Sequence, residues 1–351
     1  MMRSAFITWS SLKPDQLQLN SFASGTVCSG VRPTMCTRSC PFAMISLPNT
    51  VATLPVPTIT ILIRFTFVNM NVQNKLALGY IRTKLNILSA ISEKMAGDEL
   101  FRLFCTPPGK VRPKANGVFS AYEKVSFILN GKKVHGYRCN YPAKKTALLL
   151  HGFSSCIDNF SDFVEPLVQK GYAVLAFDAP AHGLSEGKTI NAVQYAEMVN
   201  HILNEYGPVH ALIGHSFGGL AIALALENDK SEAERQVVLI APATETTTAI
   251  EGALKLLSLH NPRFRTALER KIENFSGRKA EWFSIRRAIG NIEGQVLWLH
   301  DETDRITPMT DVLRVKNDNH PHITFHFTSG LGHRRIYRDA SVRQQIMNFL
   351  H

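Results

Sequence analysis

Short apolar runs separated by polar segments dominate the chain after residue 120 and predict the strands of one sheet. Six of these runs are predicted strands. One lies at 146–150, the next ends directly before Asp178, and the others lie at 209–213, 237–240, 295–300 and 323–327. Runs of this length are typical of buried strands. Two further runs, 122–129 and 133–139, flank Asn130-Gly131, so they predict an antiparallel hairpin that opens the sheet. The pattern therefore predicts an α/β fold with a single sheet over 120–351.

A segment with helical periodicity precedes this sheet in the sequence. Apolar residues recur at helical spacing over 71–104, and the run stops at Pro107-Pro108-Gly109. The segment 70–110 is thus predicted to hold one or two amphipathic helices, which pack on the rest of the chain or on a second subunit. Four basic residues also allow weak contact of 71–104 with an anionic membrane surface: Lys75, Arg82, Lys84 and Lys94.

Residues 1–69 differ in composition, with one acidic residue, Asp15, in a basic segment rich in serine, threonine and proline. No apolar run closely follows the first methionines, so a secretory signal is a poor match. The apolar stretch 51–68 is interrupted by Pro55, Pro57 and Arg64, which argues against a membrane span. We expect a disordered leader or an upstream region read as protein, with Met70 as the natural start; an organelle transit peptide is the alternative.

One serine lies where a strand is predicted to turn sharply into a helix. Gly214-His215-Ser216-Phe217-Gly218 follows the run 209–213 and precedes a helix-like stretch at 220–227. A G-x-S-x-G motif in this position is typical of a nucleophile elbow, in which small residues let strand and helix pass closely. The sequence therefore predicts Ser216 as a nucleophile, with a tight structural turn as the alternative for a motif taken alone.

A carboxylate and a histidine follow in the order that such a nucleophile needs. A serine hydroxyl requires a histidine to take its proton, and a carboxylate to orient that histidine. His333 follows the run 323–327 and is the predicted base. Two carboxylates follow the run 295–300 and are the candidate acids, Asp304 and its rival Asp301.

Five motifs in order resemble the α/β-hydrolase superfamily: His151-Gly152-Phe153, the segment 177–185, the Ser216 elbow, Asp304 with Pro308, and Gly332-His333. From Tyr122 to Leu350 the chain is similar to single-domain esterases, monoacylglycerol lipases and serine aminopeptidase-like members. The resemblance implies a mostly parallel sheet flanked by helices. It also implies that the acid is Asp304 and not Asp301, because the family pattern places the acid four residues before a proline, here Pro308. The backbone N–H groups of Phe153 and Phe217 are implied to form an oxyanion hole.

The stretch between the runs 237–240 and 295–300 is longer than a bare fold needs. It is apolar and basic, and it predicts a short helical lid at about 244–291, after the sixth strand, that closes over the serine. For most of its residues, a solvated helical cover is the plainer interpretation.

The remaining histidines favour structural roles. His215 is expected to pack beside the helix, and His182 to shape the rim of the site. His320, His322 and His326 crowd one strand region, but no carboxylate or cysteine accompanies them at ligand spacing, so a surface strand is favoured over a metal site. Neither a metal nor a cofactor is expected.

Net charge and cysteine usage indicate which partners and which compartment to expect. The net charge of +11 comes without aromatic interleaving or a nucleic-acid motif, so no nucleic-acid partner is expected. The scattered cysteines suit a reducing compartment, which favours a cytoplasmic location, and Cys156 is expected to be a packed thiol.

These observations predict a serine hydrolase that cleaves a small-molecule carboxylic ester through an acyl-enzyme, as a carboxylesterase or lipase-like enzyme. The alternatives among enzymes are a serine aminopeptidase or amidase and a thioesterase. A binding protein without turnover on the same scaffold is the alternative outside enzymes. Because position 216 is a serine, chemistry that needs an aspartate nucleophile is disfavoured. The sequence leaves the oligomeric state open.

Overall fold

The computed structural model describes residues 72–114, 117–229 and 235–351. By its internal contacts the chain divides into Met1–Lys75 and Leu76–His351, and of the first unit only the start of one helix is described. The predicted leader, 1–69, lies outside the described residues and stays a prediction.

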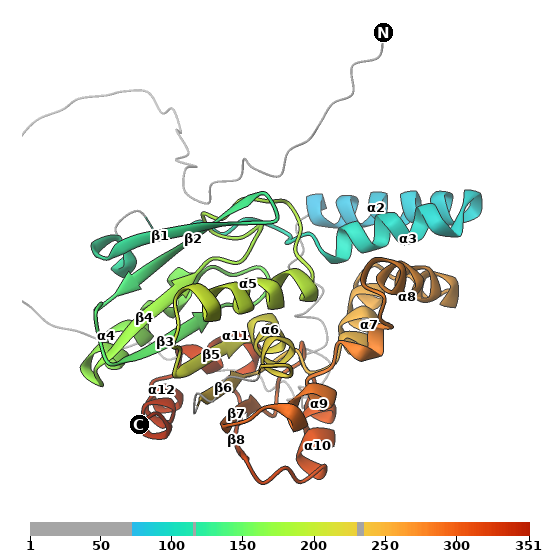
Figure 1. Ribbon diagram of the computed structural model, residues 1–351. Helices are drawn as coiled ribbons and strands as arrows, with labels where there is room; N and C mark the ends of the chain where they lie inside the picture. The colour runs from blue at the N-terminus through green and yellow to red at the C-terminus, as the bar shows by residue number, and fades with distance from the viewer. Residues whose placement is uncertain (1–71, 115–116, 230–234) are drawn as a thin grey trace, which may run out of the picture. The chain divides into compact units, whose positions relative to one another are not determined.

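Eight strands form one sheet in the order β1-β2-β4-β3-β5-β6-β7-β8 (Figure 1). The strands are β1 (Glu123–Leu129), β2 (Lys132–Cys139), β3 (Lys145–Leu150), β4 (Tyr172–Phe177), β5 (Ala211–His215), β6 (Gln236–Ile240), β7 (Gln295–Asp301) and β8 (Ile323–Thr328). β1 and β2 form the predicted antiparallel hairpin, and β2 also pairs antiparallel with β4. All later pairings are parallel, so the predicted mostly parallel sheet is confirmed.

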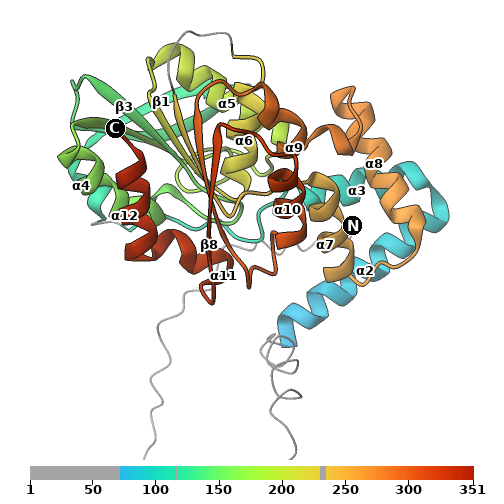
Figure 2. The same cartoon turned by 90° about the horizontal axis from the view of Figure 1, so that it is seen from below.

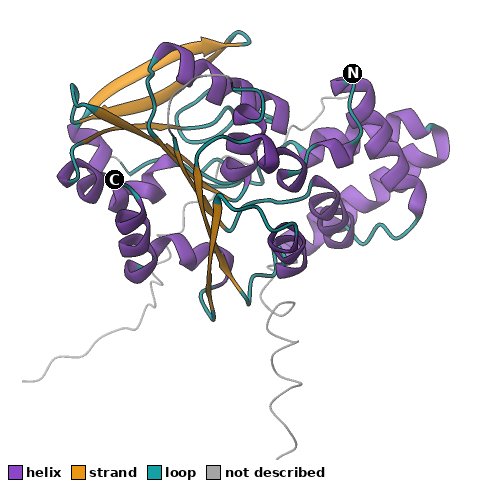
Figure 3. Ribbon diagram, turned by 60° about the horizontal axis from the view of Figure 1, so that its bottom comes forward, coloured by secondary structure: helices purple, strands orange, loops and turns teal. Residues whose placement is uncertain are grey.

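Helices cover both faces of this sheet (Figures 2 and 3). They are α2 (Val72–Ile91), α3 (Glu93–Phe104), α4 (Ser161–Gln169), α5 (Ala192–Glu205), α6 (Phe217–Leu226), α7 (Thr246–Leu256), α8 (Pro262–Ser276), α9 (Ile285–Ala288), α10 (Met309–Asn317), α11 (Gly332–Arg335) and α12 (Ala340–Phe349). No helix in the described ranges is both long and apolar enough to cross a bilayer.

Two hydrophobic layers hold the helices to the sheet, one on each face. Leu148 and Leu150 of β3 belong to the layer that includes residues of α5 and α6, whereas Leu149 belongs to the layer that includes residues of α4 and α12. Successive side chains of a strand point to opposite faces. A strand covered on both faces must therefore be apolar throughout, which explains the unbroken apolar runs in the sequence.

The N-terminal helices pack within the larger unit. Leu85 of α2 is fully buried, and α3 packs against α8 in the insertion between β6 and β7. Gly97 of α3 permits a close approach, since a Cβ at that position would lie 2.6 Å from the carbonyl oxygen of Ala267. Two ion pairs also join these helices: Glu93–Arg270 at 2.7 Å and Asp98–Lys271 at 2.6 Å.

Candidate active site

Ser216 lies at the turn between β5 and α6 with a strained backbone. Its φ of 53° and ψ of −116° fall outside the regions that residues with a side chain favour. The Ser216 N–H donates to the carbonyl of Ile240 at 3.0 Å, and its own carbonyl accepts from the N–H of Ala243 at 3.0 Å. Both partners belong to β6 and the loop after it. Because the neighbouring strand fixes both peptide groups of the turn, the strained conformation can persist.

The glycines around Ser216 are needed for space, as the elbow motif predicts. A Cβ on Gly218 would lie 2.7 Å from the carbonyl oxygen of Leu150 on the neighbouring strand β3. A Cβ on Gly214 would lie 2.9 Å from the backbone carbonyl carbon of Gly218 in α6. Any side chain at either position would force α6 away from the sheet.

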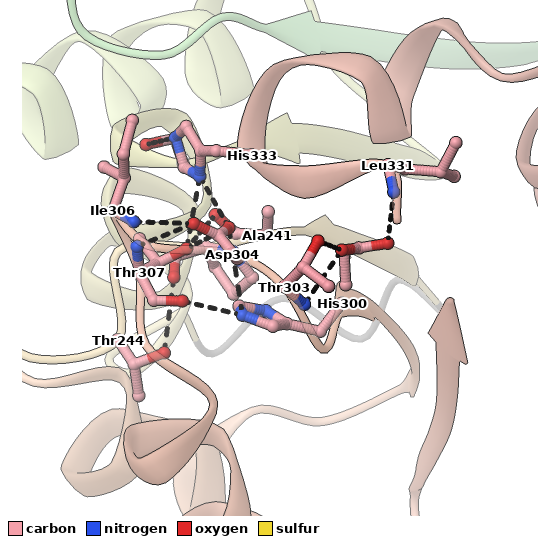
Figure 4. Close-up of polar contacts among 12 residues, drawn as sticks. Ala241, Thr244, His300, Thr303, Asp304, Ile306, Thr307, Leu331 and His333 are labelled. Carbon is pink, nitrogen blue, oxygen red and sulfur yellow. Dashed lines mark hydrogen bonds and ion pairs between the residues drawn. The ribbon is translucent and has the colours of Figure 1, made fainter. Parts of the chain in front are cut away.

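Three of the residues predicted for the site form one chain of hydrogen bonds, although they come from three strand ends. Ser216 Oγ lies 3.0 Å from His333 Nε2. His333 Nδ1 lies 2.8 Å from Asp304 Oδ2 (Figure 4). The carboxylate can only accept, so Nδ1 carries the imidazole proton and Nε2 is free to accept from the serine hydroxyl. This arrangement can move a proton from Ser216 to His333.

Asp304 is held by donors on both of its oxygens. Oδ1 accepts from the N–H groups of Ile306 at 2.8 Å and Thr307 at 3.0 Å, while Oδ2 also accepts from the Thr307 hydroxyl at 2.7 Å. Burial raises the pKa of Asp304, but the hydrogen bonds and the charge of His333 outweigh burial, and the pKa lies below its usual value. The carboxylate is therefore charged at neutral pH. The hydroxyl of Thr307 also lies 3.2 Å from His333 Nδ1, a contact that the sequence analysis missed.

Asp301, the rival acid, has a different set of partners. Its carboxylate accepts from the Thr303 N–H and hydroxyl, from the Thr328 hydroxyl at 2.8 Å and from the Leu331 N–H at 2.9 Å. Burial raises the pKa of Asp301, but these hydrogen bonds lower it well below the usual range. Asp301 thus anchors the loop that carries His333, whereas Asp304 contacts the imidazole itself.

The loop after β3 lies directly against the elbow. A Cβ on Gly152 would sit 3.0 Å from the Cβ of Ser216, and the rings of Phe153 and Phe217 meet edge to face at 5.8 Å. Phe217 is the first residue of α6, so its N–H has no partner within the helix. The structure therefore brings both predicted oxyanion-hole residues, Phe153 and Phe217, to the immediate surroundings of Ser216.

His182 is buried and supports this loop, whereas the sequence predicted that it shapes the rim of the site. Its Nε2 accepts from the Ser154 N–H at 3.2 Å, and its Nδ1–H donates to the Pro180 carbonyl at 3.0 Å. Burial, assisted by nearby His151, lowers the pKa of His182 to about 3. The imidazole is neutral at ordinary pH, which is the state that can accept the Ser154 hydrogen bond.

His215 makes a long-range contact that the sequence did not reveal. Its Nε2 lies 2.9 Å from the carbonyl oxygen of His333, and its ring contacts those of His333 at 4.7 Å and Tyr337 at 4.6 Å. Burial lowers its pKa to about 3, so the neutral ring donates through Nε2 to that carbonyl. The prediction placed this side chain beside the helix; its observed partners lie in the His333 segment. The only signal in the sequence was its position next to Ser216.

The other candidates stand apart from this site. Of the three crowded histidines only His326 lies in a strand, while His322 Nε2 lies 3.2 Å from the Ile289 carbonyl oxygen. Across the described ranges, no group of three or more potential ligand side chains is placed to bind a metal. Cys156 is buried, and burial raises the pKa of its thiol to about 11.

The strand order and the elbow define the class of protein. The chain belongs to the alpha/beta hydrolase family, whose model matches residues 147–340, more than half of the sequence. The predicted α/β-hydrolase fold and the resemblance are thereby confirmed, while the lid stays a prediction.

Individual relatives match shorter stretches. The chain is 34% identical over 116 residues to the dihydrolipoyllysine-residue acetyltransferase component of the acetoin cleaving system of Cupriavidus necator, covering 31% of this chain and 30% of that protein. It is 31% identical over 102 residues to a Mycoplasma pneumoniae protein named as an esterase/lipase, covering 29% of this chain and 38% of the relative. The matches thus span less than half the length of these curated relatives.

Among solved structures, an esterase of Pyrococcus furiosus has a similar fold. It superposes with a TM-score of 0.53 at 21% identity, covering 70% of this chain and 97% of that one.

Proposed function

We propose that the protein is a serine hydrolase that cleaves carboxylic esters through an acyl-enzyme intermediate. The observation that carries this proposal is the hydrogen-bond chain from Ser216 Oγ through His333 to Asp304. The family supports hydrolase chemistry, and the relative named as an esterase/lipase supports an ester substrate.

The proposed reaction uses each of these groups in turn. Ser216 Oγ attacks the ester carbonyl while His333 Nε2 takes its proton, and Asp304 stabilises the imidazolium that forms. The N–H groups of Phe153 and Phe217 stabilise the oxyanion of the tetrahedral intermediate. As the intermediate collapses, His333 returns the proton to the departing alcohol. A water molecule then releases the acid from Ser216 by the same steps, with His333 again acting as base.

We further propose that the insertion between β6 and β7 forms the substrate pocket and acts as a lid. Its helices α7 and α8 contribute Ile250, Leu254 and Phe264 to the same hydrophobic layer as α6, whose first residue follows Ser216. An insertion that packs beside the elbow can shape the space for an acyl or alcohol group. The domain division that accompanies this proposal is a helical segment at 70–110 and a hydrolase domain at 120–351.

The test is hydrolysis of p-nitrophenyl esters from acetyl to palmitoyl, beside aminoacyl p-nitroanilides, by the full chain. Ser216→Ala should lower ester turnover by at least about 10³-fold, because it removes the nucleophile. Ser120→Ala, at an exposed serine, should leave the rate unchanged. A fluorophosphonate should label the wild type and not Ser216→Ala.

Two other results would contradict the proposal. A preference for the anilides would make the protein a peptidase or amidase. Absence of both turnover and labelling in folded protein would favour a binding protein without catalysis.

A further inference from the structure

We propose that His215 is a positioning residue, which holds the segment of His333 and the loop after β3 at the separation that the reaction needs. The inference rests on the function proposed above and concerns the same site. His215 is the last residue of β5 and directly precedes Ser216. Its side chain nevertheless contacts two segments that are far from it in the sequence. One carries the base, His333, and the other carries Phe153, whose N–H is a proposed oxyanion-hole donor.

The first contact ties His215 to the backbone of the base. Its Nε2 lies 2.9 Å from the carbonyl oxygen of His333, and the two rings have centroids 4.7 Å apart. A carbonyl only accepts, so Nε2 carries the proton and donates. Tyr337 packs against the same ring at 4.6 Å. The peptide group of the base is thus attached to the strand that leads to the nucleophile, independently of the bond between Ser216 and the imidazole of His333.

The other ring nitrogen faces the loop after β3. A Cβ on Gly152 would lie 2.9 Å from His215 Nδ1 and 3.0 Å from the Cβ of Ser216, so this glycine packs against both residues. Gly152 is followed directly by Phe153. A shift of the His215 ring would therefore move the loop that carries a proposed oxyanion-hole donor as well as the segment that carries the base.

Stability alone does not explain a histidine at this position. The His215 side chain is buried, and within the described residues its Nδ1 has no hydrogen-bond partner. With the proton on Nε2, Nδ1 is an unpaired acceptor, and leaving it buried costs at least as much free energy as one neutral hydrogen bond contributes. An apolar side chain of similar size would avoid this cost. The histidine is accounted for if the bond from Nε2 to the His333 carbonyl serves the reaction.

The ring is also held in its neutral state. Burial lowers the pKa of His215 to about 3, and the neighbouring His333 acts in the same direction, while Asp304 acts against it. Because the ring stays neutral, it adds no charge beside His333 when that imidazole takes the proton of Ser216 in the proposed reaction. An ammonium or guanidinium donor in this place would instead disfavour that protonation.

Substitutions of similar size separate the hydrogen bond from the packing. His215→Gln keeps a donor, since the glutamine amide nitrogen can take the place of Nε2, whereas His215→Met and His215→Leu have none, so either can serve if the other does not fold. His210→Met is the matched control. His210 precedes the same strand at its other end, about 17 Å away, and its Nδ1 accepts from the Thr146 N–H at 3.1 Å. The readouts, on the full chain, are kcat and KM for p-nitrophenyl esters and the rate at which a fluorophosphonate labels Ser216.

We expect the donor-free variants to lower kcat and the labelling rate by about 10²-fold, since a displacement of about 1 Å at a reacting group can cost that much. KM should stay within about twofold, because His215 acts through the base and the loop and not on the substrate. His215→Gln should restore both rates to within about tenfold of the wild type. His210→Met should match the wild type. Circular dichroism spectra that match the wild type would show that the variants are folded.

Labelling makes the test independent of the substrate class, because a fluorophosphonate reacts with an activated serine in esterases and amidases alike. Three results would overturn the positioning role and leave the proposed function standing. The donor-free variants could keep rates within about threefold of the wild type, folded His215→Gln could be as slow as they are, or His210→Met could be as slow as they are. If the folded wild type shows neither turnover nor labelling, the proposed function fails, and the positioning role fails with it.

Discussion

Replacing Asp304 with asparagine would reverse the tautomer of His333 while preserving the shape of the side chain. Oδ1 accepts from two backbone N–H groups, those of Ile306 and Thr307, so the carbonyl oxygen of an asparagine must take that position. The amide NH₂ then stands in the place of Oδ2, 2.8 Å from His333 Nδ1. An amide NH₂ only donates, so Nδ1 must accept and the imidazole proton moves to Nε2. An Nε2–H group cannot take the proton of Ser216.

The expected loss of activity is large compared with the loss of stability. The wrong histidine tautomer lowers kcat by about 10⁴-fold in a serine protease, and we expect a fall of the same order for Asp304→Asn. That factor corresponds to about 5 kcal/mol of transition-state stabilisation. Stability should fall by only about 1.5–3 kcal/mol, because a charge-assisted hydrogen bond to His333 is lost while the bonds to Ile306 and Thr307 remain.

The assay is the initial rate of p-nitrophenyl ester hydrolysis at saturating substrate, with thermal unfolding followed by circular dichroism. Asp301→Asn is the matched control: it loosens the loop that carries His333, so it should lower stability while slowing turnover by only about tenfold. The reasoning is refuted if folded Asp304→Asn keeps more than about a tenth of the wild-type kcat. It is also refuted if Asp301→Asn loses as much activity as Asp304→Asn.

Two further predictions concern stability. His151, His182 and His215 are buried and their pKa values are lowered to about 4, 3 and 3, so only the unfolded chain binds protons as the pH falls below about 6.5. Each histidine should therefore lower the free energy of unfolding by about 1.4 kcal/mol for every pH unit below about 6.5. The free energy of unfolding measured with urea should be about 4 kcal/mol lower at pH 5.5 than at pH 7. Equal unfolding midpoints at the two pH values would contradict this. Gly218→Ala should lower the free energy of unfolding by about 1–3 kcal/mol because its Cβ would lie 2.7 Å from a strand carbonyl, and it should slow ester hydrolysis by shifting Ser216. Gly252→Ala, in a helix with nothing within 4 Å of the new Cβ, should instead raise the free energy of unfolding by about 0.5–1 kcal/mol. A loss of stability in Gly252→Ala similar to that in Gly218→Ala would refute the steric argument.

The strands were predictable from the sequence because burial on both faces leaves an unbroken apolar run. The ends of the strands were less predictable. The run that begins at Val209 predicted a strand over 209–213, whereas β5 spans Ala211–His215. Val209 is fully buried although it precedes the strand, and His215 belongs to the strand although it is polar. Hydrophobicity reports burial, while the strand is defined by its hydrogen bonds, and at the elbow the two do not coincide.

The positions of Ser216, Asp304 and His333 were predictable for a different reason. Parallel strands end at one edge of the sheet, so side chains just beyond those ends meet regardless of their separation in the chain. Which carboxylate reaches the imidazole depends instead on the conformation of the loop at 301–308. In that loop Asp301 turns toward Thr328 and Leu331. Hydrophobic periodicity does not report this choice, and Asp304 was preferred because the family motif places the acid four residues before a proline, here Pro308. Nothing in the sequence pattern reports the contact between His215 and the His333 carbonyl.

The packing of α3 against α8 bears on how the proposed lid could move. The side chains of the Glu93–Arg270 pair are about half exposed or more and those of the Asp98–Lys271 pair are partly exposed, and such pairs contribute at most about 1 kcal/mol each. The apolar contact is the stronger link, because Phe101 and Phe275 have ring centroids 5.4 Å apart and the backbones approach closely at Gly97. Opening α8 alone would expose this contact to water, so we expect α8 to carry α3 with it. A cover over Ser216 would then combine the insertion with a helix that precedes the hydrolase domain by sequence.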